Sequence, residues 1–139
     1  MYLLDTNVIS AFRRPDRLPA SVQAWATSVE AADFYLSAIT VLEIEQGILA
    51  KTRSDHAQGA ILRAWFDGDV LSAFEGRIIP FDATIARKCA SLHVPDPRPE
   101  RDAMIAATAI VHGLTVVTRN ISDFAKLQAD LLDPWSFGE

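Results

Sequence analysis

Short apolar runs alternate along this chain with longer stretches in which apolar residues recur every three to four positions. The short runs predict buried strands at Tyr2–Leu4, Phe34–Ser37, Arg77–Phe81 and Leu114–Val117, with a weaker fifth at Leu131–Leu132. The longer stretches predict helices at Asn7–Phe12, Ala20–Ala31, Thr40–Ala50, His56–Phe74, from an Asp82 cap to Leu92, and at Glu100–His112. This alternation predicts an α/β fold, with a mostly parallel sheet of four to five strands flanked by helices.

The length and composition indicate one domain that spans residues 1–139. Half of the 139 residues are hydrophobic, which is enough for a single substantial core. The sequence contains no internal repeat, low-complexity tract or long linker. The helical stripes that contain Trp25 and Trp65 are therefore expected to face this core, with a groove for a protein partner as the alternative.

Several classes of protein are disfavoured by the residue pattern. No apolar run is as long as a membrane span, and Asp5 interrupts any signal peptide at the N-terminus, so we expect a soluble cytoplasmic protein. The single Cys89 excludes an internal disulfide and fits a buried thiol. The three histidines show no zinc-ligand spacing: His56, His93 and His112.

The formal net charge of −5 argues against broad, non-specific binding of nucleic acid through a basic face. It does not exclude a nucleic-acid enzyme whose acidic side chains are concentrated in a metal site. Most of the basic residues fit ordinary solvated surface. The candidates for local phosphate contacts are Arg13, Arg14, Arg17, Lys51, Arg53, Arg98, Arg101 and Arg119.

The first candidate for chemistry is Asp5, which follows the predicted strand Tyr2–Leu4 directly. The carboxyl edge of an α/β sheet is where such folds place ligands and catalytic groups. Asp5 also suits the N-cap of the next helix, although Thr6 is an equally good cap residue. Its place at the strand end favours a metal role.

Three further acids occupy settings that lead to the same edge, and each has a structural alternative. Glu43 completes a Thr40-Val41-Leu42-Glu43 capping box, in which its carboxylate bonds back to the backbone of Thr40; Gly47 leaves the backbone bare one turn later on the same face. Asp102 lies in the first turn of a predicted helix, where the helix dipole favours any carboxylate. Asp123 follows the fourth strand, and the structural alternative is that it or Ser122 caps a short turn. Asp82 is assigned to helix capping alone.

Four carboxylates without neighbouring lysines predict a site for a divalent cation. Crowded carboxylates raise one another's pKa unless a cation is bound, and oxygen ligands suit Mg²⁺ or Mn²⁺. The hypothesis is that Asp5, Asp102 and Asp123 ligate the metal directly or through water, and that Glu43 ligates it or orients the attacking water.

Four motifs in this order resemble those of the PIN-domain family, and more narrowly those of the VapC and FitB-like toxins of bacterial toxin–antitoxin modules. They are Leu3-Leu4-Asp5-Thr6-Asn7, Ser37-Ala38-Ile39-Thr40-Val41-Leu42-Glu43, Asp102-Ala103-Met104-Ile105-Ala106-Ala107-Thr108-Ala109, and Thr118-Arg119-Asn120 with Asp123-Phe124. The closing Asp133-Pro134-Trp135 is similar to that subgroup as well. Together these motifs cover nearly the whole chain.

The resemblance implies a magnesium- or manganese-dependent endoribonuclease whose acidic positions match Asp5, Glu43, Asp102 and Asp123. The polar residues that support the site in the family match Thr6, Asn7 and Thr118. The resemblance also implies a cognate antitoxin that inhibits the nuclease, promoter DNA bound only through that antitoxin, and a homodimer or larger toxin–antitoxin assembly.

Other classes fit the residues less well. A haloacid-dehalogenase-like phosphatase needs a second aspartate two residues after the first, where Asn7 stands, and a phospho-receiver domain needs a lysine where Thr118 stands. A non-catalytic co-repressor that acts with a DNA-binding partner remains the alternative, and metal binding distinguishes it from the enzyme.

Overall fold

Five short parallel strands form the centre of the molecule in the computed structural model, which describes residues 1–138. The strands are β1 (Tyr2–Leu4), β2 (Phe34–Ser37), β3 (Ile78–Ile79), β4 (Thr115–Val117) and β5 (Leu131–Leu132). Their order in the sheet is β3-β2-β1-β4-β5, and every neighbouring pair is parallel. In the middle strand, Leu3 lies between Tyr35 of β2 and Val116 of β4. The predicted parallel sheet, including its fifth strand, is confirmed.

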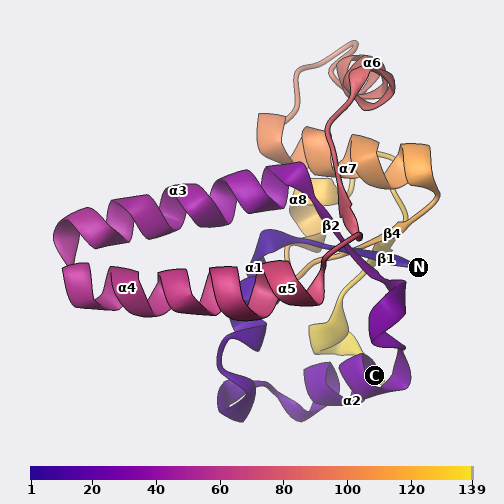
Figure 1. Cartoon of the computed structure of the whole chain (residues 1–139). Coiled ribbons are helices and arrows are strands. Elements are labelled where there is room, and N and C mark those ends of the chain that lie inside the picture. Colours follow the sequence, from indigo (N-terminus) through magenta and orange to yellow (C-terminus); the bar gives the residue numbers. More distant parts are fainter. Residues whose placement is uncertain (139) are drawn as a thin grey trace.

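Helices follow the strands and cover the sheet on both faces (Figure 1). They are α1 (Thr6–Phe12), α2 (Ala20–Ser28), α3 (Ala38–Ser54), α4 (His56–Trp65), α5 (Leu71–Ala73), α6 (Ala83–Leu92), α7 (Glu100–His112) and α8 (Ile121–Phe124). Three single 3₁₀ turns occur at Pro15–Arg17, Ala31–Asp33 and Pro134–Ser136. Helix α7 ends at Gly113, whose positive φ of 67° provides the left-handed C-cap.

The alternation of side chains along the strands divides the core into two layers. Leu3 belongs to a buried cluster with residues of α6, α7 and α8, whereas Leu4 belongs to a second cluster with residues of α1, α2 and α3. Four alanines of α7 are fully buried, so this helix lies close against the sheet: Ala103, Ala106, Ala107 and Ala109. Trp25 is 1% exposed, which confirms the core prediction for its helix, while Trp65 is only partly buried.

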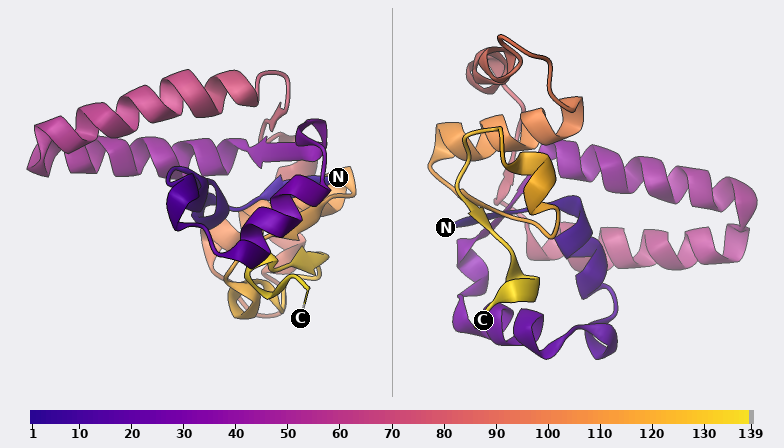
Figure 2. Two further views of the ribbon diagram at one scale, coloured as in Figure 1. Left: turned by 90° about the horizontal axis from the view of Figure 1, so that it is seen from below. Right: turned by 180° about the vertical axis from the view of Figure 1, so that it is seen from behind.

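Helices α3 and α4 form an antiparallel pair that extends well beyond the rest of the molecule (Figures 1 and 2). Their close approach depends on Gly59 of α4, because a Cβ atom at that position would lie 2.6 Å from the Cα of Thr52 in α3. Farther along the pair, the Arg63 guanidinium donates two hydrogen bonds to the carboxylate of Glu45, at 2.7 and 2.5 Å.

Several predicted boundaries were wrong for identifiable reasons. Helix α3 begins at Ala38 rather than Thr40, because the Ser37 hydroxyl accepts a hydrogen bond from the amide of Ile39 at 3.0 Å and so caps the helix earlier. The same helix continues to Ser54, beyond the predicted end at Ala50. The third strand is confined to Ile78–Ile79, since Pro80 has no amide hydrogen to extend the pairing.

Other boundaries differ by smaller amounts. Helix α1 begins at Thr6 instead of Asn7, and strand β4 begins at Thr115 instead of Leu114. Helix α2 ends at Ser28, because Val29 and Glu30 are extended and the 3₁₀ turn begins at Ala31. The helix predicted over residues 56–74 contains a π-helical turn at Phe66–Val70, between α4 and α5.

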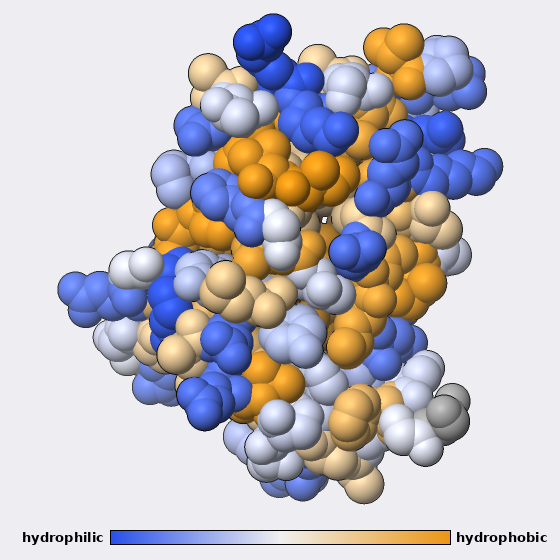
Figure 3. Space-filling view, turned by 90° about the vertical axis from the view of Figure 1, so that its right-hand side faces the viewer, coloured by the Kyte–Doolittle hydropathy of each residue, from blue (hydrophilic) through white to orange (hydrophobic). Residues whose placement is uncertain are grey.

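The side of the molecule near the amino-terminal strand ends has a mixed surface. Figure 3 shows hydrophobic groups there that are separated by hydrophilic residues. Within residues 1–138, no helix combines the length and the hydrophobicity that a bilayer crossing requires.

Candidate active site

The carboxylate of Asp5 lies at the carboxyl end of the central strand, and its side chain is held in place on both oxygens. The residue is 6% exposed. Its Oδ1 accepts a hydrogen bond from the amide of Thr6 at 2.8 Å, so Asp5 is the N-cap of α1. The alternative in which Thr6 caps this helix is wrong. Capping and a place at the sheet edge are therefore compatible roles of one carboxylate.

The second oxygen of Asp5 connects the first strand to the fourth. The buried hydroxyl of Thr118 donates a hydrogen bond to Oδ2 at 2.8 Å, and the side-chain amide of Asn7 donates another at 3.2 Å. The Asn7 Oδ1 in turn accepts from the amide of Arg119 at 3.3 Å. Because β1 and β4 are neighbours on the side where the chain order of the strands reverses, these residues occupy the topological switch point of the sheet.

Glu43 approaches this edge from α3 and bonds to Thr6 rather than to its own helix terminus. The Thr6 hydroxyl donates to Oε1 of Glu43 at 2.7 Å. Thr40 lies inside the helix and is fully buried, so the predicted capping box between Thr40 and Glu43 is wrong. A small cavity of about 170 Å³ opens between α1, α3 and α4 beside Glu43, and Gly47 lines it without touching another helix.

Asp102 and Asp123 approach from the other face of the sheet, on which α7 and α8 lie. Asp102 lies in the first turn of α7, as predicted, and is partly buried. Asp123 lies in the first turn of α8 and is exposed. Neither Ser122 nor Asp123 caps this short helix, whose N-cap is Asn120 without a side-chain cap bond. The structural explanation considered for Asp123 is therefore wrong. The explanation for Asp82 is confirmed, because its Oδ1 caps α6 through the amide of Ile85 at 2.9 Å.

Electrostatics shows that the four acids share one region. Burial is the largest cause that raises the pKa of Asp102 to about 6, and the negative charges of Asp5, Asp123 and Glu43 contribute to the same rise in that order. Burial also raises the pKa of Asp5 above its ordinary value. Hydrogen bonds from Thr118 and Thr6 oppose this rise, while the charges of Glu43 and Asp123 add to it. The carboxylates are thus close enough to repel one another.

The chemistry of this donor set fits a hard divalent cation, which relieves repulsion among carboxylates. Across residues 1–138, no three Asp, Glu, His or Cys side chains are arranged as a ready-made cage for a metal ion. The acids therefore share an electrostatic field, and only Asp5 and Glu43 have carboxylates fixed by the hydrogen bonds described above.

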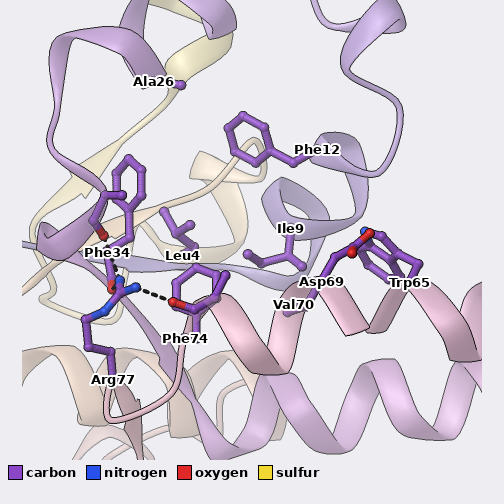
Figure 4. Close-up of a pocket in the computed structure, with 12 residues that line it drawn as sticks. Leu4, Ile9, Phe12, Ala26, Phe34, Trp65, Asp69, Val70, Phe74 and Arg77 are labelled. Carbon is purple, nitrogen blue, oxygen red and sulfur yellow. Dashed lines mark hydrogen bonds between the residues drawn. The ribbon is translucent and has the colours of Figure 1, made fainter. Parts of the chain in front are cut away.

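Two further cavities lie close to helix α1. One of about 290 Å³ is almost wholly apolar and is lined by residues that include Leu4, Phe12, Phe34, Trp65 and Phe74 (Figure 4). Trp65 therefore lines this cavity while it also packs against the core cluster that contains Leu4. Arg77 closes one end of this cavity and donates hydrogen bonds to the carbonyl oxygens of Ala31 at 2.6 Å, of Phe34 at 2.5 Å, and of Ala73.

The other cavity, of about 440 Å³, lies where α1 leads into the 3₁₀ turn Pro15–Arg17, and its lining is basic. The sequence indicated Arg13, Arg14, Arg17 and Arg119 among the candidates for phosphate contacts. It did not indicate that they surround one cavity, because Arg119 and Trp135 are distant in sequence from the remaining lining residues.

Comparison with known proteins agrees with this geometry. The family model described as "PIN domain" matches residues 2–129. The VapC ribonuclease Y4jK of Sinorhizobium fredii is 37% identical, and the match covers 97% of this chain and 98% of that protein. Toxin FitB of Neisseria gonorrhoeae is 38% identical, with 97% and 99% covered. The solved structure of FitAB bound to an IR36 DNA fragment superposes with a TM-score of 0.82 at 34% identity, covering 100% of this chain and 99% of that one.

The motif order, the five-stranded parallel sheet and the acidic edge are all consistent with a match over this much of the sequence. The chain belongs to the PIN-domain family.

Proposed function

We propose that this chain is the toxin of a type II toxin–antitoxin pair and that it hydrolyses RNA phosphodiester bonds as a metal-dependent endoribonuclease. The observation that carries the proposal is the buried carboxylate of Asp5, held by Thr6, Asn7 and Thr118 at the switch point of the sheet. The similarity to a VapC ribonuclease and to toxin FitB supports the same reaction and biological role.

Asp5, Asp102 and Asp123 are the proposed metal-holding residues, and Mg²⁺ or Mn²⁺ is the proposed ion. When bound, such an ion supplies an activated water, neutralises the phosphodiester and stabilises the leaving oxygen. Within this arrangement, Asp5 is the fixed donor because both of its oxygens accept hydrogen bonds from the protein. The two other aspartates approach from α7 and α8, on the far side of the switch point.

Glu43 is the proposed group that orients the attacking water. The hydroxyl of Thr6 donates a hydrogen bond to Oε1, and this contact also orients Oε2 of the same carboxylate. This role suits a carboxylate that stands on a different helix from the aspartates and that borders a small cavity.

A cognate antitoxin is the proposed partner. A basic side chain of such a protein fits the acidic edge, where it replaces the cation as counter-charge. Promoter DNA is then contacted through the antitoxin, consistent with the similarity to FitAB bound to DNA. A homodimer or a larger toxin–antitoxin assembly and a cytoplasmic location complete the proposal.

The test is a titration of Mn²⁺ and Mg²⁺ into the wild type and the Asp5→Asn variant, with cleavage of a mixed RNA pool measured alongside. Asparagine is as good an N-cap as aspartate, so the fold is expected to survive. Asp82→Asn is the matched control, because Asp82 also caps a helix but lies outside the acidic edge. Binding and cleavage that disappear only in Asp5→Asn support the nuclease. Full cleavage by a folded Asp5→Asn protein contradicts it, and absence of both activities in the wild type favours the non-catalytic co-repressor.

A further inference from the structure

The basic cavity beside α1 is unusual in a chain of net charge −5. Its lining includes Ser10, Arg13, Arg14, Arg17, Arg119 and Trp135, and none of its lining residues within the described chain is acidic. Four of the 13 lysines and arginines of the sequence therefore surround one cavity of about 440 Å³. Such a concentration of positive charge fits an anionic ligand.

The charges of these arginines are not neutralised by the protein. Over residues 1–138, every ion pair within 4.0 Å involves Arg63, which lies on α4. Asp16 stands between Arg14 and Arg17 in the sequence but forms no such pair. The guanidinium groups of this cavity are thus available to a ligand.

One wall of the cavity is an aromatic surface. The guanidinium carbon of Arg119 lies 5.0 Å from the ring centroid of Trp135. The backbone of Trp135 is held on both sides, since its amide donates to Asp133 at 2.9 Å and its carbonyl accepts from the Ser21 hydroxyl at 3.1 Å. A planar guanidinium over an aromatic ring offers the kind of surface on which nucleic-acid bases stack.

The cavity adjoins the acidic edge through two elements. Along α1, Ser10 and Arg13 line both this cavity and the small cavity beside Glu43. Arg13 follows Asp5 by eight positions, which corresponds to roughly 12 Å along a helix. From β4, Arg119 follows Thr118 directly, and its amide donates to Asn7. A nucleic-acid strand that is bound at the carboxylates therefore needs to extend only a short distance to contact the arginines.

We propose that this arginine–tryptophan pocket binds the RNA strand next to the scissile phosphodiester, with backbone phosphates at Arg14 and Arg17 and a base at the Arg119–Trp135 stack. The inference rests on the proposed nuclease function and identifies where its substrate is held. It also explains how an acidic site retains a polyanion, since the neighbouring positive charge offsets the repulsion from the carboxylates. An acidic peptide of a protein partner matches the charge but makes no use of the stacking surface.

The test uses full-length Asp5→Asn protein, which is expected not to cleave, and a short fluorescein-labelled single-stranded RNA. The double variant Arg14→Gln/Arg17→Gln removes two exposed arginines from the pocket, and Arg87→Gln/Lys88→Gln removes two positive charges from α6, outside the pocket. Loss of the pocket pair is expected to weaken RNA binding about tenfold and to reduce the salt-dependence slope by about 1.4, at about 0.7 per phosphate contact. The control pair is expected to change both quantities little.

The same two double variants are also made in the protein that retains Asp5. Their cleavage of RNA separates the pocket hypothesis from the nuclease hypothesis. If the variants of Arg14 and Arg17 bind and cleave RNA as efficiently as the control variants, the pocket proposal is overturned and the nuclease proposal stands. RNA binding that depends on the pocket, without cleavage by the wild type, supports the pocket and contradicts the nuclease. Binding of a polyglutamate peptide that depends on the pocket pair, while RNA binding does not, assigns the cavity to an acidic protein segment and overturns the RNA proposal.

Discussion

The hydroxyl of Thr118 donates a hydrogen bond to Oδ2 of Asp5 at 2.8 Å, although 113 positions of the sequence separate the two residues. This contact lowers the pKa of Asp5, against the rise that burial causes. The contact thereby favours the charged form of a carboxylate that is 6% exposed. In the proposed reaction, Thr118 therefore acts through Asp5 rather than through the substrate.

Thr118→Val is expected to reduce the cleavage rate about tenfold at neutral pH, because a hydrogen bond to a charged group is worth about 1.5–3 kcal/mol. Without the hydroxyl, the pKa of Asp5 rises further, so the pH profile of cleavage moves toward higher pH. Thr108→Val is the control, since Thr108 is equally buried but its hydroxyl bonds to the carbonyl of Met104 within α7. Initial cleavage rates between pH 5 and 9 check this; coincident profiles for Thr118→Val and the wild type contradict it.

Glu43→Gln is expected to reduce cleavage by about 10²-fold with little loss of stability, since the Thr6 hydroxyl can still donate to an amide oxygen. Glu45→Gln makes the same change of charge two positions later and removes only the surface pair with Arg63. Single-turnover cleavage of RNA and thermal unfolding measure the two effects. Equal activity of both variants removes Glu43 from the reaction.

Divalent-metal binding is expected to weaken as the pH falls through about 6. The native pKa of Asp102 is raised to about 6, so its carboxylate is charged above that pH and protonated below it, and the proton competes with the cation. Calorimetric titration with Mn²⁺ between pH 5 and 8 gives the affinity and the number of protons released. The Asp102→Asn variant is expected to bind more weakly throughout and to lose this pH dependence; a pH-independent wild type contradicts the assignment.

The Gly59→Ala substitution is expected to lower the free energy of unfolding by about 1–3 kcal/mol, because the new methyl group meets the backbone of Thr52 and forces α3 and α4 apart. Gly47→Ala adds a methyl group where no atom lies within 4 Å. It is expected to raise the free energy of unfolding by about 0.5–1 kcal/mol, since alanine favours a helix more than glycine does. Urea denaturation of both variants measures whether the two changes in the free energy of unfolding have opposite signs.

The sheet and the convergence of acids were accessible from sequence because local patterns encode them. Each strand is a short apolar run, and Asp5 follows the first of these runs directly, so its position at the edge required only the parallel topology. Asp102 was placed in the first turn of its helix by the same reasoning.

The details that failed depend on contacts between distant segments. The role of Glu43 was ambiguous because the Thr40 capping box is a valid local signal, whereas its real partner, Thr6, comes from another helix. The basic cavity was not recognised as one site for a similar reason, since Arg119 meets Trp135 only after β4 and the C-terminal 3₁₀ turn have come together. The start of α3 is an exception, because its signal is local: Ser37 ends the second strand as predicted and also caps α3 through the amide of Ile39.

The central position of β1 has a consequence for the time at which the site can form. The strand is made early in translation, but its neighbour β4 and the Thr118 hydroxyl emerge from the ribosome 113 residues after Asp5. At about 5–20 residues per second, that interval is roughly 6–23 s. During this interval, the nascent chain contains Asp5 and Glu43 but lacks β4 and Thr118, which form the other side of the switch point. The topology of the sheet therefore postpones assembly of the proposed nuclease site until translation is nearly finished.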